Sequence, residues 1–198
     1  MKARLLLCSI SACLLLSGCP SSSVYPLYTD QDAVVEPALE GMWSSLGPDE
    51  NEEFLFRKSG DHEYSLTIFC ADTKVTQNYE VHLVRLGGQL FMDLIFKDQA
   101  VDGAEVDDPL GVVSTHVIAK VNISGDDLAY ATLEDDAIRN QSVSGATPLD
   151  YQMANGSMLV TTQTEALRLY ISAHAEDVFS DFEHLQRRRE TSIREFSR

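Results

Sequence analysis

Few residues in this chain of 198 residues have the types and spacing that catalysis or metal binding requires. His62 and Glu63 are adjacent, but the second histidine of a His-Glu-X-X-His zinc helix is missing. No Gly-X-Ser-X-Gly elbow, phosphate-binding loop or dinucleotide fingerprint occurs. His82 and His116 share no metal-ligand spacing, and both fall on the polar side of an alternating pattern, so we expect them to face solvent. We therefore expect no catalytic residue, no cofactor and no resident metal, and hence a protein that is not an enzyme.

Two further features could do chemistry. Cys70 shares its parity with the apolar residues Tyr64, Leu66 and Ile68, which predicts a buried, unreactive thiol without a disulfide partner. The stretch 98–108 clusters carboxylates, which calcium favours as ligands. Because the order of these residues differs from that of an EF-hand loop, we expect a solvated acidic loop, with a calcium site as the alternative.

The amino-terminal 18 residues have the pattern of a secretory signal peptide. Lys2 and Arg4 precede an apolar run that begins at Leu5, and small residues end it. The run is too short to span a bilayer as a mature helix. The tetrad Leu16-Ser17-Gly18-Cys19 resembles the lipobox of bacterial lipoproteins. This resemblance implies cleavage before Cys19, a diacylglyceryl group on its sulfur and, in many bacteria, a palmitate-like acyl chain on the new amino terminus; an ordinary secretory signal is the alternative.

The resemblance also implies where the protein resides. Several acyl chains anchor a protein stably, whereas one chain binds marginally at about 0.8 kcal/mol per buried CH₂. In the sorting pattern of enterobacterial lipoproteins, aspartate after the cysteine retains the protein at the inner membrane, and here that residue is Pro20. We therefore expect a lipid anchor on the periplasmic side of the outer membrane, with the inner membrane as the alternative.

The chain beyond the signal peptide is strongly acidic. The chain has 15 Lys and Arg residues, of which Lys2 and Arg4 are removed with the signal peptide. The remaining 13 positive and 31 negative side chains give a formal net charge of −18. Such a surface repels nucleic acid and anionic headgroups, so we expect no nucleic-acid partner. A cluster of arginines near the carboxyl terminus is interpreted as a solvated face, with a phospholipid contact as the alternative: Arg187, Arg188, Arg189, Arg194 and Arg198.

Composition divides the chain into four parts. Residues 1–18 are the signal peptide, and residues 19–40 are expected to form the lipidated amino terminus and a tether, because prolines interrupt them and no sustained period occurs. Apolar residues such as Tyr28 and Val34 leave open that the second half of this tether packs on the domain. A single domain is expected over residues 41–188, followed by a polar basic tail at 189–198.

Alternating apolar residues predict antiparallel strands within this domain. Gly87-Gly88 between two such runs predicts a tight hairpin, because glycine readily adopts the positive φ angles of a two-residue loop. Residues 97–111 are expected to be a loop. Ser180 and Glu183 are interpreted as a possible cap of a short final helix. Three hairpins are predicted, from 52–58 with 63–70, from 79–83 with 90–96 and from 117–123 with 128–133. After them we expect a helix over 134–143, irregular chain over 144–155 and a strand over 156–161. A helix capped by Thr162 and Glu165 follows.

This order of elements predicts a mainly β fold. We expect an antiparallel up-and-down meander of seven or eight strands curled into a barrel or half-barrel, with a helix after strand seven and an amphipathic carboxyl-terminal helix. Gly41-Met42-Trp43 resembles the Gly-X-Trp of lipocalins, which are up-and-down barrels with a helix after the strands. The stretch from Leu27-Tyr28-Thr29 through Trp43 to the last helix also resembles a group of uncharacterised bacterial lipoproteins.

Two functions follow from this fold. The first is a non-catalytic barrel that binds a small apolar ligand or lipid among large inward side chains. The alternative is a structural or protein-interaction lipoprotein of the envelope whose barrel is filled by the same side chains. The residues expected in the barrel interior are Trp43, Phe54, Phe56, Tyr64, Tyr79, Met92 and Phe96.

Overall fold

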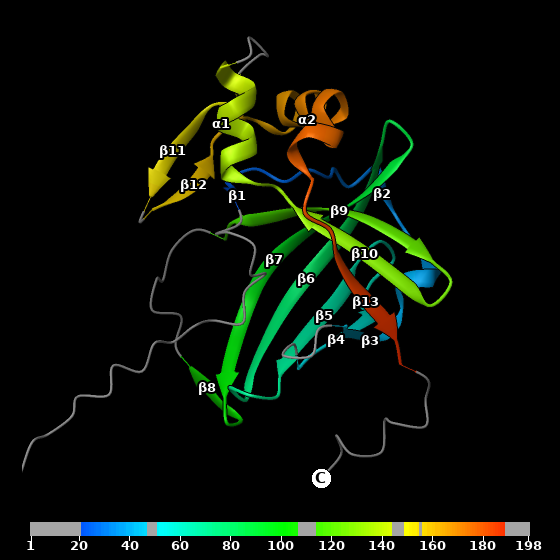
Figure 1. The fold of residues 1–198 in the computed structure, drawn as a ribbon. Helices are drawn as coiled ribbons and strands as arrows, with labels where there is room; N and C mark the ends of the chain where they lie inside the picture. The colour runs from blue at the N-terminus through cyan, green and yellow to red at the C-terminus, as the bar shows by residue number, and fades with distance from the viewer. Residues whose placement is uncertain (1–20, 47–50, 107–113, 144–148, 155, 189–198) are drawn as a thin grey trace, which may run out of the picture.

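The computed structural model describes residues 21–46, 51–106, 114–143, 149–154 and 156–188. At its centre is a closed antiparallel barrel of eight strands, which confirms the predicted fold class (Figure 1). β13 pairs with both β10 and β3 and so completes the barrel. In order around the barrel, the strands are β3 (Gly41–Ser45), β4 (Glu52–Lys58), β5 (Tyr64–Cys70), β6 (Val75–Leu86), β7 (Gln89–Val101), β9 (His116–Ser124), β10 (Asp127–Thr132) and β13 (Glu183–Arg187).

Tight turns and alternation account for the consecutive hairpins of the barrel. The three predicted hairpins are confirmed as β4–β5, β6–β7 and β9–β10. At the turn of the longest hairpin, Gly87 and Gly88 have φ angles of +57° and +82°. Both values lie in the left-handed region that a type I′ turn requires, so this loop matches the right-handed twist of its strands.

Replacing both Gly87 and Gly88 with valine should lower the free energy of unfolding by more than about 1 kcal/mol. Nothing lies within 4 Å of a Cβ added at either position, so the loss would come from backbone strain and not from a clash. Urea unfolding of the purified protein measures it. The matched control is Gly87→Asn, which the same φ angle tolerates; equal losses in both variants would contradict the explanation.

The acidic stretch 97–111 is not wholly a loop, which corrects the prediction. β7 continues to Val101, and β8 (Ala104–Val106) returns beside it. Asp102 and Gly103 form the turn, with φ angles of +52° and +79°. Two carboxylates of this acidic stretch have protein partners, because Asn78 donates to Asp98 at 2.7 Å and Lys74 pairs with Asp102 at 3.1 Å. The side chains of Glu105, Asp107 and Asp108 lie outside the described residues.

The elements after the barrel hairpins differ partly from the prediction. The two predicted helices are confirmed as α1 (Asp135–Val143) and α2 (Thr164–Val178), and β12 (Ser157–Val160) is the predicted short strand. Within the stretch expected to be irregular, β11 (Tyr151–Ala154) pairs with β12. The predicted cap of this helix by Thr162 and Glu165 is wrong, because Gln163 is the N-cap of α2. The Thr162 hydroxyl instead accepts a hydrogen bond from the Asp150 amide at 2.7 Å. The expected final helix is also wrong, because those residues form β13.

The expected tether is corrected for residues 21–40, which belong to the folded domain. β1 (Ser22–Ser23) pairs with both β9 and β12, and β2 (Ala33–Val34) pairs with β6. A single 3₁₀ turn, η1 (Pro37–Leu39), then leads into the barrel. Leu27 and Leu39 are fully buried. This segment therefore holds to the barrel by backbone pairing and apolar contact.

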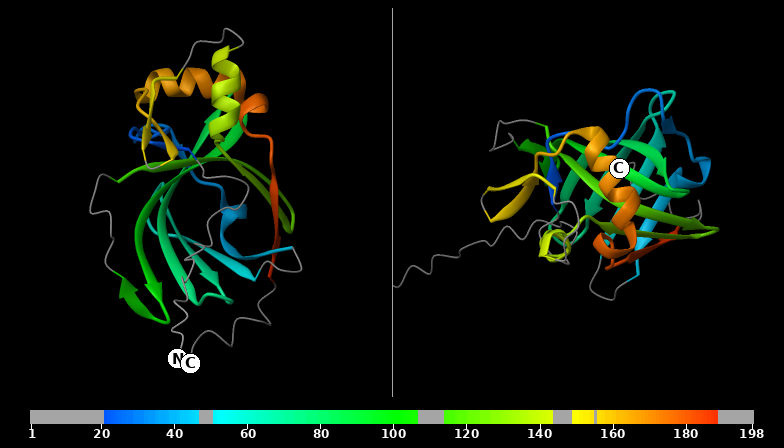
Figure 2. Two further views of the ribbon diagram at one scale, coloured as in Figure 1. Left: turned by 60° about the vertical axis from the view of Figure 1, so that its left-hand side comes forward. Right: turned by 90° about the horizontal axis from the view of Figure 1, so that it is seen from above.

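Two apolar cores share the wall of the barrel. The first fills its interior, and the second lies between the outer face of the wall and the elements that cover it. Figures 1 and 2 show α1, α2 and the β11–β12 hairpin together on one side of the barrel, next to β9 and β10. Ile118 and Ala119 are adjacent on β9 and belong to different cores. Within the described part of the chain, neither helix is long and apolar enough to cross a bilayer.

Gly41, Trp43 and Arg187 fasten the first barrel strand to the last. The Arg187 guanidinium lies 4.1 Å from the centre of the Trp43 ring and donates to the Glu40 carbonyl at 2.6 Å. A Cβ on Gly41, whose φ is +129°, would lie 2.7 Å from the guanidinium. Glycine is favoured at this position, because another residue would be strained at this φ and its Cβ would displace the Arg187 guanidinium.

Cys70, at the end of β5, is only 4% exposed, so its predicted burial is confirmed. Its sulfur is disulfide-bonded, so the prediction of a thiol without a disulfide partner is wrong. The other cysteines of the chain, Cys8, Cys13 and Cys19, lie outside the described residues.

Candidate functional site

The barrel interior contains the residues that the sequence placed there. Six of the seven are buried in one apolar cluster, and the seventh, Phe96, is partly buried against it. Tyr79 and Phe96 make an edge-to-face contact with ring centres 5.6 Å apart, and Phe54 meets Tyr130 at 6.1 Å. The interior is thus a packed aromatic and aliphatic core. The six buried residues are Trp43, Phe54, Phe56, Tyr64, Tyr79 and Met92.

A small apolar cavity of about 40 Å³ remains in this interior. Phe54, Phe56, Tyr79 and Met92 line it, together with aliphatic neighbours from β5, β7, β9, β10 and β13. Binding sites for drug-sized ligands usually measure about 300–1,000 Å³. The cavity is therefore far smaller than the ligand site that the sequence suggested.

Trp43 and Tyr64 lie in the barrel core but do not line this cavity. The Trp43 indole donates to the Leu39 carbonyl at 2.9 Å, and the Tyr64 hydroxyl accepts from the Glu36 amide at 2.9 Å. Both contacts fix the segment around η1 against the barrel. These two aromatic residues therefore hold the barrel core to the chain that precedes β3.

Polar side chains lie beside the cavity, close to Tyr79. The Tyr79 hydroxyl donates to the Gln77 side-chain carbonyl at 3.2 Å, and the Gln77 amide donates to Gln99 at the same distance. Burial, and then the charge of Glu52, raise the pKa of Tyr79 to about 12. The phenol therefore stays protonated at neutral pH and acts as a hydrogen-bond donor, not as a base.

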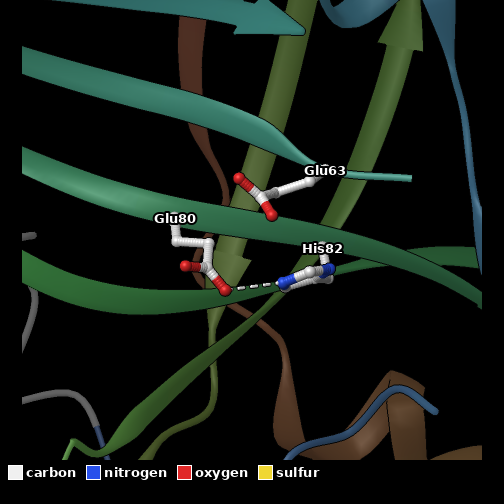
Figure 3. A group of neighbouring side chains, drawn as sticks. All are labelled: Glu63, Glu80 and His82. Atoms are coloured by element: carbon white, nitrogen blue, oxygen red, sulfur yellow. Dashed lines mark hydrogen bonds and ion pairs between the residues drawn. The ribbon is translucent and has the colours of Figure 1, made fainter. Parts of the chain in front are cut away.

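A second group of side chains lies on the outer face of the barrel and was not predicted as a site. Glu63, Glu80 and His82 come together where β5 begins beside β6 (Figure 3). His82 Nε2 lies 2.9 Å from a Glu80 carboxylate oxygen, and Lys97 Nζ lies 2.5 Å from the other oxygen. The Tyr28 ring stacks on the His82 imidazole with centres 3.8 Å apart. We call Glu63, Glu80 and His82 the His82 cluster.

An open pocket of about 230 Å³ adjoins the His82 cluster. Its walls come from the segment before β2, the turn between β4 and β5, and β6. The pocket thus brings acidic, imidazole and phenol groups to one hollow of the surface. It is lined by Tyr28, Asp30, Ala33, Gly60, Asp61, His62, Glu63 and His82.

The electrostatics of this region are dominated by carboxylates. Burial, followed by the charges of Asp93 and Glu80, raises the pKa of Tyr28 to about 12. The hydrogen bond from Lys97 lowers the pKa of Glu80, and the hydrogen bond to His82 lowers it further. Glu80 is therefore an anion at neutral pH, and the Tyr28 phenol is neutral.

Beneath Tyr28, the contacts of a buried carboxylate fix the amino-terminal segment to the barrel. Asp93 is completely buried, lies 2.7 Å from His116 Nδ1 and accepts from the Leu27 amide at 2.6 Å. Arg168 of α2 donates to the Leu27 carbonyl at 2.9 Å. Both polar groups of the Leu27 backbone are thus bound by side chains from distant parts of the chain.

Neither His82 nor His116 faces solvent, which corrects the prediction. Their side chains are only 12% and 11% exposed. Alternation placed both correctly on the outer face of the barrel, but that face is covered by Tyr28 and its neighbours. One sequence signal could have pointed to this: Leu27-Tyr28 is more apolar than a free tether requires.

The fold and its sites define a closed, eight-stranded β-barrel with a second apolar core on its outer wall. The chain matches no protein-family model, no curated protein and no solved structure.

Proposed function

We propose that this chain is a lipid-anchored protein of the bacterial cell envelope, with a non-catalytic barrel that meets protein partners through its outer surface. The observation that carries this proposal is the packed interior, where the cavity among the large side chains of the described strands measures about 40 Å³. Of the two functions suggested by the fold, the structural or protein-interaction one fits this interior better. A small barrel whose side chains occupy its centre serves as a rigid scaffold.

The anchor in this proposal rests on the amino-terminal sequence. A basic start, an apolar run and the tetrad ending at Cys19 support export and acylation. With a formal net charge of −18 after loss of Lys2 and Arg4, the remaining chain gains nothing from anionic headgroups, so acyl chains would supply the attachment. Pro20 supports sorting to the outer membrane over retention at the inner one.

Native mass spectrometry of the protein purified from membranes tests both parts of the proposal. We expect a mass that corresponds to a chain beginning at Cys19 with covalent acyl groups, and no small molecule retained beside it. An apolar ligand retained at one molecule per chain would contradict the interpretation that side chains fill the barrel, and would favour the ligand-binding alternative. The disulfide of Cys70 bears on this anchor, because removal of residues 1–18 leaves Cys19 as the other cysteine of the chain. One sulfur cannot form both bonds, so a disulfide at Cys19 in place of a thioether would overturn the anchor.

Phe54→Ala provides a matched probe of the interior. Phe54 is 3% exposed and lines the cavity, so truncation should enlarge it and cost about 3–5 kcal/mol of stability. We expect an apolar fluorescent probe to bind the folded variant and not the wild type, as followed by fluorescence titration. Leu169→Ala is the control, since Leu169 is 69% exposed on α2. Equal probe binding by the wild type would contradict the proposal.

A further inference from the structure

We propose that the His82 cluster binds a divalent transition-metal ion, with zinc as the representative. Glu63, Glu80 and His82 each offer one ligand atom, and these atoms lie within 4.8 Å of one another. Zinc sites with three protein ligands and an open fourth position commonly combine imidazole and carboxylate groups. This inference is independent of the proposed function, because it concerns the outer face of the barrel.

Two neighbouring strands position the three ligands. Glu80 and His82 are two residues apart on β6, so their side chains project from the same face of the sheet. The register that pairs Tyr64 with Val81 brings Glu63, immediately before β5, alongside His82. Strands hold side chains more firmly than loops, and Glu80 and His82 lie on a strand while Glu63 directly precedes one, so the donor atoms are already close to a common centre.

Contacts around the ligands orient them further. The Tyr28 ring lies flat against the His82 imidazole at 3.8 Å, Ser59 donates to Glu63 at 2.8 Å, and Lys97 holds the distal oxygen of Glu80 at 2.5 Å. In metal sites, such outer contacts fix ring orientation and keep carboxylates in position. Lys97 leaves the other Glu80 oxygen, which faces His82, available to the ion.

The adjoining pocket gives the ion access to solvent. Glu63 and His82 both line this hollow of about 230 Å³, which has room for water or a small anion at the fourth coordination position. Asp30 and Asp61 line it as well and add negative charge to its walls. A cation can therefore enter along a path of favourable potential.

The donor set selects among cations. Calcium and magnesium prefer ligand shells made only of oxygen, whereas an imidazole nitrogen suits zinc and its neighbours in the transition series. Zinc binding would replace the contact between His82 Nε2 and Glu80, now 2.9 Å long. His82 would then bind the ion through its Nε2 lone pair and carry its proton on Nδ1.

Isothermal titration of the full-length purified protein with ZnCl₂, after treatment with a chelator, tests the proposal. We expect one zinc ion per chain in the wild type. Glu63→Gln and His82→Ala should each weaken binding by more than about tenfold, since even changes outside the ligand shell cost about 10–100-fold. Titration with CoCl₂ should give visible ligand-field absorption that both variants lose.

His184→Ala is the matched control. His184 also lies beside an aspartate, with Nδ1 3.4 Å from Asp127, but its side chain is 52% exposed and does not line the pocket. This variant should bind zinc as the wild type does. Circular dichroism verifies that each variant is folded, and Glu63→Gln tests the site without removing the stacked ring. Absence of stoichiometric zinc binding, or binding unchanged in both cluster variants, would overturn the proposal.

Discussion

Replacing Asp93 with alanine should lower the free energy of unfolding by about 2–3 kcal/mol, the upper part of the usual cost of leaving a buried polar group without its hydrogen-bond partner. Asp93 is 0% exposed, and its two oxygens contact the His116 ring and the Leu27 amide. The variant would leave the Leu27 N–H buried without an acceptor, and a buried unsatisfied donor is itself destabilising. Urea unfolding of the purified protein measures the change.

A matched exposed pair separates burial from charge in this experiment. Asp127 lies 3.4 Å from His184, and their side chains are 40% and 52% exposed. Asp127→Ala should cost less than about 1 kcal/mol, because exposed ion pairs contribute little. Asp93→Asn keeps an acceptor and should fall between the two. If Asp93→Ala were no more damaging than Asp127→Ala, the Asp93 contacts would not hold the amino-terminal segment in place.

The second large effect concerns the location of the protein. Under the proposed function, Cys19→Ala removes the sulfur that carries the lipid, so nearly all of the protein should leave the membrane pellet. It should appear in the soluble fraction or as uncleaved precursor, because an acidic chain has no other strong attachment. Fractionation followed by immunoblotting measures the distribution.

Cys13→Ala is the control for this change. It removes a cysteine from the same segment but leaves the tetrad that ends at Cys19 unchanged, so the protein should stay in the membrane fraction. A Cys19→Ala protein that is cleaved and still resists extraction from the membrane with carbonate would rule out the anchor.

The hairpins of the barrel were predictable because their signals are local. Alternation and the Gly87-Gly88 loop determine β6 and β7, and each strand pairs with its neighbour in sequence. The Asp102-Gly103 turn was equally readable, since Asp-Gly is among the strongest hairpin signals, but the surrounding carboxylates suggested a loop. The interior residues followed from the same alternation.

Pairing between distant segments could not be predicted in this way. In β13, Leu185 is the one buried residue and its neighbours are polar, so the local pattern favoured neither a strand nor a helix strongly. Its partners on β10 and β3 supply the reason for its structure. The His82 cluster was missed for the same reason, because Glu63 and His82 are 19 positions apart in sequence and meet only through strand register.

The position of β13 also determines the order in which the barrel can fold. The closing contacts join the beginning and end of the domain, as in the 2.6 Å hydrogen bond from Arg188 to Ser44, 144 residues away. Contacts between such distant residues slow folding, because a long loop must close before they form. As the chain emerges amino terminus first, β3 and β10 keep unpaired edges until β13 arrives, and such edges invite association with other chains. The interval before the last strand docks is therefore when this protein is most exposed to aggregation.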